Sequence, residues 1–229
     1  MIVSELWRYP VKSIRGESCA DLQFEPRGVA GDRFYAVVNA DGKLGSHKRT
    51  RRFVPMPGLY EFAARTGRDG AEVTCPSGET YRVGDPALID AFSQRIGEAV
   101  AVKPETHVSH MDDGAVHVVT TASMRWLAEM LPDASIDPRR FRPNIVVECE
   151  ANGLIERSWL GKTLQIGTVL LRIEKPTERC VMTTKAIEEL PDDTRVLKTL
   201  GQHNDAKFGA YASVERSGVI ALNDAVQLL

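Results

Sequence analysis

The first hundred residues alternate between short apolar runs and turn residues, a pattern typical of β-strands. Four runs fit strands: residues 2–8, 34–38, 72–75 and 80–83. The last two flank Pro76-Ser-Gly-Glu79, which predicts a hairpin. Residues 86–96 differ, because their apolar side chains recur at helical spacing behind Asp85, a residue type that caps helices. This part of the chain therefore predicts several strands and one helix.

The rest of the chain repeats the strand pattern with one further clear helix. The apolar run 116–120 leads directly into residues 121–131, whose apolar side chains follow helical periodicity. Further runs predict strands at 144–147, at two places within 164–173, and at 211–215, 219–222 and 225–229. Many strands and only two or three helices predict a mostly β (α+β) protein of barrel architecture.

A polar stretch, residues 103–114, is the best candidate for a boundary between domains. We therefore divide the chain into residues 1–100 and 101–229. No internal repeat or low-complexity tract interrupts either part.

Composition places the chain among ordinary globular proteins and excludes several classes. Its 229 residues are 43% hydrophobic and 26% charged, which excludes wholesale disorder. No apolar run approaches the ~18 residues that a membrane helix needs. The formal net charge of −2 argues against general affinity for nucleic acid or an anionic membrane. The first residues carry Glu5 and no apolar signal region, so we expect a cytoplasmic protein.

The four cysteines are too far apart to form a familiar metal motif. They stand at 19, 75, 149 and 180, so no pair has the C-x-x-C spacing of zinc or iron–sulfur sites. Without a secretion signal, a disulfide framework is not expected either. Cys149 follows an apolar run, and it, Cys19 and Cys75 fit structural roles better than reactive ones.

Five polar segments stand out where a purely structural chain would not need them: 9–16, 27–33, 46–52, 139–144 and 178–184. Lys12 and Ser13 end a strand at a glycine turn, where an ammonium group and backbone amides can bind an anion. Arg142 and Asn144 occupy alternating positions and point to the same side. Cys180 follows Arg179 in a loop, and a neighbouring cation favours the thiolate, which binds soft metals or acts as a nucleophile. For each charged run the alternative is a solvated surface.

Taken together, these segments resemble the MOSC (molybdenum-cofactor sulfurase C-terminal) proteins that carry an N-terminal MOSC-type β-barrel. The layout is similar to the mitochondrial amidoxime-reducing components and their bacterial relatives. The matching motifs are Tyr9-Pro-Val-Lys-Ser13, Gly31-Asp-Arg33, Thr121-Ala-Ser123, Phe141-Arg-Pro-Asn-Ile-Val-Val147, Arg179-Cys-Val-Met-Thr-Thr184 and Phe208-Gly-Ala-Tyr211. They cover nearly the whole chain in the family's order. The resemblance implies two β-barrel-type domains with a cofactor cleft between them.

The resemblance also implies roles for individual residues. Cys180 would be the protein ligand to molybdenum and the catalytic residue, with molybdenum–molybdopterin as the cofactor. The residues implied as further cofactor contacts are Lys12, Ser13, Arg33, Lys48, Arg49, Asp112 (or Asp113), Thr121, Ser123, Arg142, Asn144, Arg179 and Tyr211. The chain departs from the family pattern at Ile155-Glu-Arg-Ser-Trp159 and in the loop after Thr184, which can border the substrate entrance.

The activity implied is reduction of small N-hydroxylated substrates, amidoximes and hydroxylamines. The sequence has no haem, iron–sulfur or dinucleotide motif, so we expect electrons from a separate redox protein. A second interpretation is a sulfur-transfer protein with a persulfide on Cys180, or a carrier of the molybdenum cofactor. A third is a structural β protein whose arginine clusters are merely solvated.

Overall fold

The computed structural model describes all 229 residues, which form two compact units. Unit 1 comprises Met1–Trp7, Ser18–Ala30 and Asp113–Leu229, and unit 2 comprises Arg8–Glu17 and Gly31–Asp112. Strands account for 39% of residues and helices for 21%, which confirms the prediction of a mostly β protein. There are three α-helices, of which the sequence placed two. Segments before residue 31 contribute to both units, so a single cut near residue 100 does not describe this grouping.

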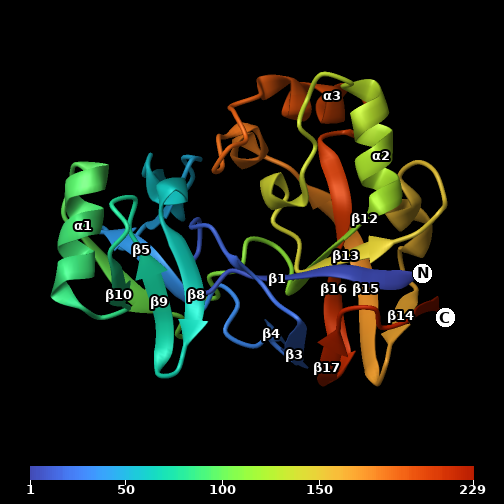
Figure 1. The fold of residues 1–229 in the computed structure, drawn as a ribbon, viewed down its shortest axis with the longest axis horizontal. Coiled ribbons are helices and arrows are strands. Elements are labelled where there is room, and N and C mark those ends of the chain that lie inside the picture. Colours follow the sequence, from blue (N-terminus) through green and yellow to red (C-terminus); the bar gives the residue numbers. More distant parts are fainter. The chain divides into compact units, whose positions relative to one another are not determined.

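An eight-stranded sheet forms the body of unit 1 (Figure 1). Its strands, in spatial order, are β18 (Val226–Leu228), β14 (Thr163–Ile166), β15 (Val169–Glu178), β16 (Lys207–Arg216), β12 (Val116–Thr120), β13 (Ile145–Glu148), β1 (Ile2–Arg8) and β2 (Glu17–Ser18). The segment around β18 also bonds to the start of β1. The Val226 amide donates to the Met1 carbonyl at 2.9 Å, and the Val3 amide donates to the Asp224 carbonyl at 3.0 Å. These hydrogen bonds close the sheet around an apolar core. A smaller sheet joins β17 (Gly218–Ala221), β3 (Asp21–Glu25) and β4 (Gly28–Val29).

The parallel pair β12 and β13 requires a crossover, which α2 (Thr121–Met130) and the 3-10 turn η2 (Pro138–Arg140) provide. The Thr120 hydroxyl accepts from the Ser123 amide at 3.1 Å and caps α2. Leu127 of α2 packs in one apolar cluster with Val196 and Leu200 of α3 (Thr194–Asn204). The two helices therefore lie together at one end of the unit (Figure 1). The 3-10 turns η3 (Ile155–Trp159) and η4 (Val181–Thr184) complete unit 1.

Unit 2 contains a mixed four-stranded sheet, an antiparallel three-stranded sheet and one helix. One sheet orders β11 (Val100–Pro104), β5 (Tyr35–Asn39), β6 (Leu44–Ser46) and β7 (Phe53–Pro55), and the other β10 (Thr80–Arg82), β9 (Gly70–Thr74) and β8 (Ala63–Gly67). A 3-10 turn, η1 (Leu59–Glu61), lies between β7 and β8 in the sequence. Helix α1 (Pro86–Ile96) is capped by Asp85, as the sequence predicts, and ends at Gly97 in the left-handed conformation. Its buried Leu88 and Phe92 complete the core of this unit.

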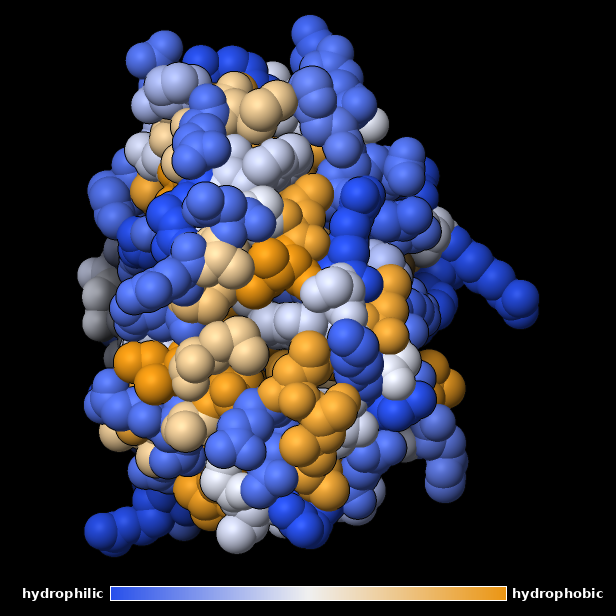
Figure 2. Space-filling model, turned by 90° about the vertical axis from the view of Figure 1, so that its right-hand side faces the viewer, coloured by the Kyte–Doolittle hydropathy of each residue, from blue (hydrophilic) through white to orange (hydrophobic).

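Apolar side chains on the surface are scattered among polar ones. Figure 2 shows hydrophobic patches interrupted by hydrophilic residues on the face that carries the chain termini. The large hydrophobic side chains that unit 1 exposes are Met1, Ile2, Met130, Leu160, Val219, Leu222 and Leu229. None of the helices is long and apolar enough to cross a membrane.

Candidate functional site

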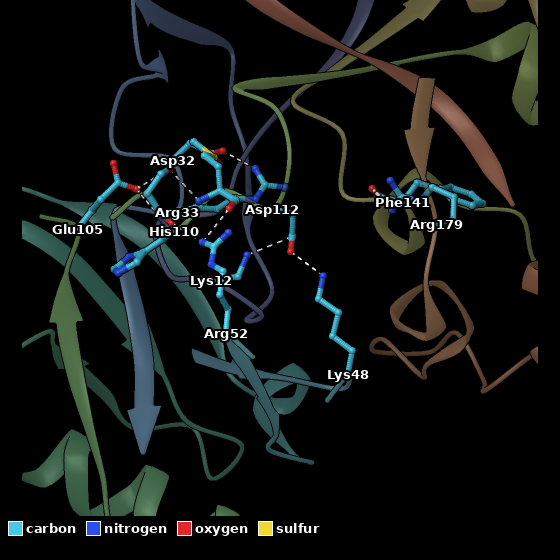
Figure 3. Close-up of polar contacts among 12 residues, drawn as sticks. Lys12, Asp32, Arg33, Lys48, Arg52, Glu105, His110, Asp112, Phe141 and Arg179 are labelled. Atoms are coloured by element: carbon cyan, nitrogen blue, oxygen red, sulfur yellow. Dashed lines mark hydrogen bonds and ion pairs between the residues drawn. The ribbon is translucent and has the colours of Figure 1, made fainter. Parts of the chain in front are cut away.

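In unit 2, one carboxylate bridges two lysines. The Asp112 Oδ2 lies 3.1 Å from the Lys12 ammonium, and its Oδ1 lies 2.8 Å from that of Lys48 (Figure 3). Lys12 is only 3% exposed, and its neighbours Val11 and Ser13 are buried as well. Predicted site residues from three distant parts of the sequence therefore meet here.

Phe53 gathers cations around its ring. The Lys48 and Lys12 ammonium nitrogens lie 4.3 and 5.0 Å from the ring centroid, and the Arg52 guanidinium carbon lies 5.3 Å away. Such contacts stabilise cations that are partly removed from water. Arg52 donates to the Ser109 carbonyl at 2.6 Å, so Asp112 is the one carboxylate paired with this group of three cations. The excess positive charge suits an anionic ligand.

Burial shapes the ionisation of this cluster. Removal from water, with a smaller contribution from the nearby Arg33, lowers the pKa of Lys12 to about 8 against the opposing effect of Asp112. Burial alone would raise the pKa of Asp112, but the ammonium groups of Lys12 and Lys48 hold it well below its usual range. Near neutral pH the cluster is therefore two ammonium groups sharing one carboxylate.

The turns that carry Ser13 and Arg33 have an unusual backbone. Ser13 has φ of 61° and Arg33 has φ of 51°, a left-handed region that costs energy for residues other than glycine. The Arg33 amide donates to the Tyr9 carbonyl at 2.7 Å, and its guanidinium lies 4.8 Å from the Tyr9 ring centroid. Arg33 also pairs with the fully buried Asp32, whose Oδ1 accepts from the Tyr9 amide at 2.8 Å. These contacts hold the two turns side by side.

In the basic run of unit 2, the arginine that joins the cluster is Arg52 rather than the predicted Arg49. Arg49 is exposed and takes no part in the Asp112 cluster, whereas Arg52 of the same basic run does. Sequence reasoning also missed Phe53 and the buried His110, whose amide donates to Glu105 at 2.6 Å. Burial lowers the pKa of His110 below its ordinary value. The signal for Arg52 was present in the basic run, but only packing places its side chain over the ring.

In unit 1, Cys180 lies between the end of β15 and the 3-10 turn η4. Its carbonyl accepts from the amide and the hydroxyl of Thr183, at 3.1 and 3.0 Å. The Arg179 amide donates to Ala206 at 2.7 Å and fixes the preceding residue. Cys180 is partly exposed, and so is Cys19, one of the three cysteines predicted to be structural, whereas the other two, Cys75 and Cys149, are buried.

Arg179 lies against Phe141 rather than against an acid. Its guanidinium carbon is 5.8 Å from the Phe141 ring centroid, and Nη2 donates to the Phe141 carbonyl at 2.8 Å (Figure 3). The buried Nε of Arg179 has no hydrogen-bond partner in the protein. A buried donor without a partner is costly, which is typical of a site that completes its hydrogen bonds with a ligand.

Arg142 directly follows Phe141, the residue that Arg179 contacts, and its backbone is in the left-handed conformation. Its φ is 53°, its amide donates to Pro138 at 3.0 Å, and the side chain is largely buried. Asn144, in contrast, is engaged within the sheet. Its Oδ1 accepts from the His117 amide at 3.1 Å, and its Nδ2 donates to the Trp7 carbonyl at 3.2 Å. Asn144 therefore connects β12, β13 and β1.

Thr121, Ser123 and Tyr211 have partners elsewhere in unit 1. Thr121 exchanges hydrogen bonds with the Cys149 backbone, donating at 3.2 Å and accepting at 3.1 Å. The Ser123 hydroxyl donates to the buried Glu156, whose pKa is raised by burial. The Tyr211 ring lies 5.6 Å from that of His117. The structure thus brings together Arg142, Arg179 and Cys180 through Phe141, and it surrounds Thr121 and Ser123 with structural partners.

Each unit by itself carries groups suited to part of an anionic, metal-containing cofactor. In unit 1, a thiol follows an arginine whose buried Nε lacks a partner, a combination that suits a soft metal with polar ligands around it. In unit 2, the clustered cations suit an anionic group. Thiolates bind soft metals, and arginine and lysine bind phosphate. Left-handed backbone at Ser13, Arg33 and Arg142 is typical of ligand-binding turns.

Comparison with known proteins gives consistent relatives. The chain is 24% identical to human mitochondrial amidoxime-reducing component 1, over 99% of this chain and 82% of that protein. Rat mitochondrial amidoxime reducing component 2 is also 24% identical, over 98% and 82%. A molybdenum cofactor sulfurase of Drosophila grimshawi is 28% identical over 85% of this chain, but over only 26% of that protein.

A solved structure and two family models are consistent with these relatives. The crystal structure of the YuaD protein from Bacillus subtilis matches 99% of this chain and 94% of its own, with a TM-score of 0.57 and 13% identity, which indicates a shared fold. Residues 1–132 match the MOSC N-terminal beta barrel domain, and residues 105–227 match the MOSC domain. This chain therefore belongs to the MOSC family.

Proposed function

We propose that this protein binds the molybdenum cofactor and reduces N-hydroxylated compounds with electrons from a separate redox protein. The observation that carries the proposal is the donor set of unit 1. There Cys180 is partly exposed, Arg179 has a buried Nε without a partner, and Arg142 has a left-handed backbone. The names of the human and rat relatives, amidoxime-reducing components, support the choice of substrate class.

The roles of individual residues follow from their chemistry. The Cys180 thiolate would bind molybdenum, while Arg142 and Arg179 would donate hydrogen bonds to the pterin. Lys12, Ser13 and Arg33 would bind the phosphate, with Lys12 protonated near neutral pH because its pKa is about 8. When bound, the cofactor supplies two-electron oxygen-atom transfer. The protein supplies binding, orientation and positive charge.

The proposed net reaction balances with an external electron donor. An amidoxime takes up two electrons and two protons, its N–O bond breaks, and an amidine and water are released. The sequence carries no pattern for a haem, an iron–sulfur cluster or a dinucleotide, which supports a separate protein as the electron source. The cytoplasmic location stays a prediction.

The reaction can be tested with purified, cofactor-loaded protein and a strong artificial electron donor. We expect amidine to form from an aromatic amidoxime, and Cys180→Ala to lower kcat by at least about a hundredfold. Cys19→Ala is the matched control, because Cys19 is also partly exposed, and it should retain activity. If the loaded protein leaves both amidoximes and hydroxylamines unchanged, the proposed reaction is wrong.

A second candidate function is sulfur transfer or delivery of the cofactor. It is favoured by the match to a molybdenum cofactor sulfurase, although this chain spans about a quarter of that protein. Cys180 would then carry a persulfide received from a sulfur-donor protein. A persulfide on Cys180, detected by mass spectrometry in protein that binds no molybdenum, would favour this function over the reductase.

A further inference from the structure

The segment that contains β6 and β7 of unit 2 is strongly basic and holds no acidic residue. Residues 42–60 contain no Asp or Glu, although the whole chain has 31 of them against 29 Lys and Arg. The cations of this segment are Lys43, Lys48, Arg49, Arg51 and Arg52. Negative charge that balances them must therefore come from another part of the protein or from a partner.

Four of these cations lie on the turn of residues 47–52, which is short and ordered. The turn joins β6 to β7, and these strands are parallel, with Leu44 opposite Phe53. Parallel neighbours usually need a connection of a dozen or more residues. The Thr50 amide donates to the Phe53 carbonyl at 3.0 Å, and its hydroxyl accepts from the amides of Arg52 and Phe53, both at 3.2 Å. The turn is therefore held by its own hydrogen bonds, so a partner that binds it pays little ordering entropy.

The cations of the turn form an inner pair and an outer pair. Lys48 and Arg52, the inner pair, point toward the segment of Asp112 (Figure 3). Lys48 pairs with Asp112 at 2.8 Å, and Arg52 donates to a backbone carbonyl at 2.6 Å. Arg49 and Arg51, the outer pair, are exposed and have no ion pair or side-chain hydrogen bond within the protein. The outer guanidinium groups therefore present uncompensated positive charge to the solvent.

The outer pair suits carboxylates on the surface of another protein. A small anion binds where donors converge in a pocket, whereas two exposed side chains on one turn suit an extended partner. Arginine binds carboxylates through two parallel hydrogen bonds. Stacking on exposed aromatic rings, which supports the binding of single-stranded nucleic acid, is missing because Phe53, the aromatic residue next to the turn, is buried.

We propose that the turn of residues 47–52 is a docking surface for an acidic protein partner, with Arg49 and Arg51 as its contact residues. Lys48 and Arg52 hold the turn against the Asp112 segment and add to the positive potential around it. Charges of this kind act mainly by raising the rate of association. The proposed reaction needs an external electron donor. To identify the partner as that donor rests on the proposed function, but the docking surface does not.

The test measures binding of fluorescent poly-L-glutamate to the full chain by anisotropy. At low ionic strength we expect Arg49→Glu/Arg51→Glu to weaken binding about tenfold, because two attractive charges become repulsive. Arg49→Lys/Arg51→Lys keeps the charge and should stay within about threefold of wild type. The difference between wild type and the Glu variant should shrink as salt is added, because salt screens exposed charges.

A matched control separates this turn from general attraction by charge. Arg68→Glu/Lys103→Glu makes the same change in net charge at two exposed cations of unit 2 that also have no partner. It should change binding less than about twofold, and both Glu variants should unfold at the wild-type temperature because all four side chains are exposed.

An equal loss in the control, or unchanged binding in Arg49→Glu/Arg51→Glu, would overturn the docking surface. Tighter binding of a DNA oligonucleotide than of poly-L-glutamate through these two arginines would overturn the acidic protein as partner. If Arg49→Glu/Arg51→Glu loses binding while the cofactor-loaded wild type does not reduce amidoximes, the docking surface is retained and the proposed reaction is rejected.

Discussion

The two units balance their buried positive charge in different ways. In unit 2, Lys12 and Lys48 share the carboxylate of Asp112, a full negative charge. In unit 1, Arg140 and Arg179 donate instead to backbone carbonyls, which are dipoles without net charge. A carboxylate competes with an incoming anion, whereas a carbonyl leaves the charge of the guanidinium uncompensated. Unit 2 can therefore be tuned by pH and charge, while unit 1 depends on precise hydrogen bonding.

The largest effect should come from removing a carbonyl-bound arginine. We expect Arg140→Met to lower the free energy of unfolding by about 3 kcal/mol, because three carbonyls lose their donor in a buried site. Urea unfolding measures this change. Arg65→Gln, which breaks an exposed pair, should cost less than about 1 kcal/mol. Equal costs for the two variants would remove the distinction between buried and exposed arginines.

The next effect concerns the competing carboxylate of unit 2. We expect Asp112→Asn to increase affinity for inorganic sulfate about tenfold at about pH 6, because the internal anion is gone. The substitution also removes the charge that opposes burial, so the pKa of Lys12 should fall below 8 and the gain should shrink at about pH 8. Calorimetric titration at both pH values measures this. An unchanged affinity at both would show that Asp112 does not compete with anions.

A smaller effect follows from the pKa of Lys12 in the wild type. Its folded value of about 8 lies below the ordinary 10.5, so the unfolded chain binds more protons between these values. Stability should therefore rise with pH over that window, while sulfate affinity should fall about fivefold as pH increases through 8. Sulfate keeps its charge in this range. Lys12→Arg, which stays charged, should show neither trend, and a pH-independent wild type would contradict the assigned burial.

The smallest effect tests strain in the site turns. Ser13→Gly should stabilise the fold by up to about 1 kcal/mol, since glycine adopts its φ of 61° without strain, yet it should weaken cofactor retention. Asn223, with φ of 69°, is the matched position outside the site. Asn223→Gly should give a similar gain in thermal unfolding and leave cofactor content unchanged. A loss of stability in Ser13→Gly would indicate a structural hydroxyl instead.

Local signals explain what could be predicted from the sequence. Helix α1 was predictable because Asp85 and its periodic apolar residues act within one segment. Helix α3 was missed because it is mostly polar and buries few residues, such as Val196 and Leu200, although Asp193 caps it as a visible start signal. Cys180 stood out because it follows a strand beside an arginine in a matching motif. The proposed roles of the site residues rest on the family resemblance, because no local pattern assigns them.

The contacts and burial of several polar side chains depend on tertiary packing and could not be predicted from the sequence. The Lys12 ammonium lies over the Phe53 ring, and Arg52 donates to the Ser109 carbonyl, so these contacts join residues that are far apart in the chain. Arg140 belongs to the polar segment 139–144, which the sequence singles out for chemistry, yet its side chain is fully buried and donates to backbone carbonyls. Thr121 and Ser123 matched a family motif, and their hydrogen bonds go to Cys149 and Glu156. Periodicity reports which residues are apolar, but it does not report which partner a polar side chain meets.

Whether Cys180 binds a molybdenum cofactor, as we propose, can be measured from the metal content of purified protein. The protein should be expressed in a host that makes the cofactor, as wild type, Cys180→Ala and the control Cys19→Ala. We expect close to one molybdenum per chain in wild type and Cys19→Ala, with loss of the metal or an altered molybdenum spectrum in Cys180→Ala. Wild type without molybdenum, or Cys180→Ala with full content and an unchanged spectrum, would contradict it.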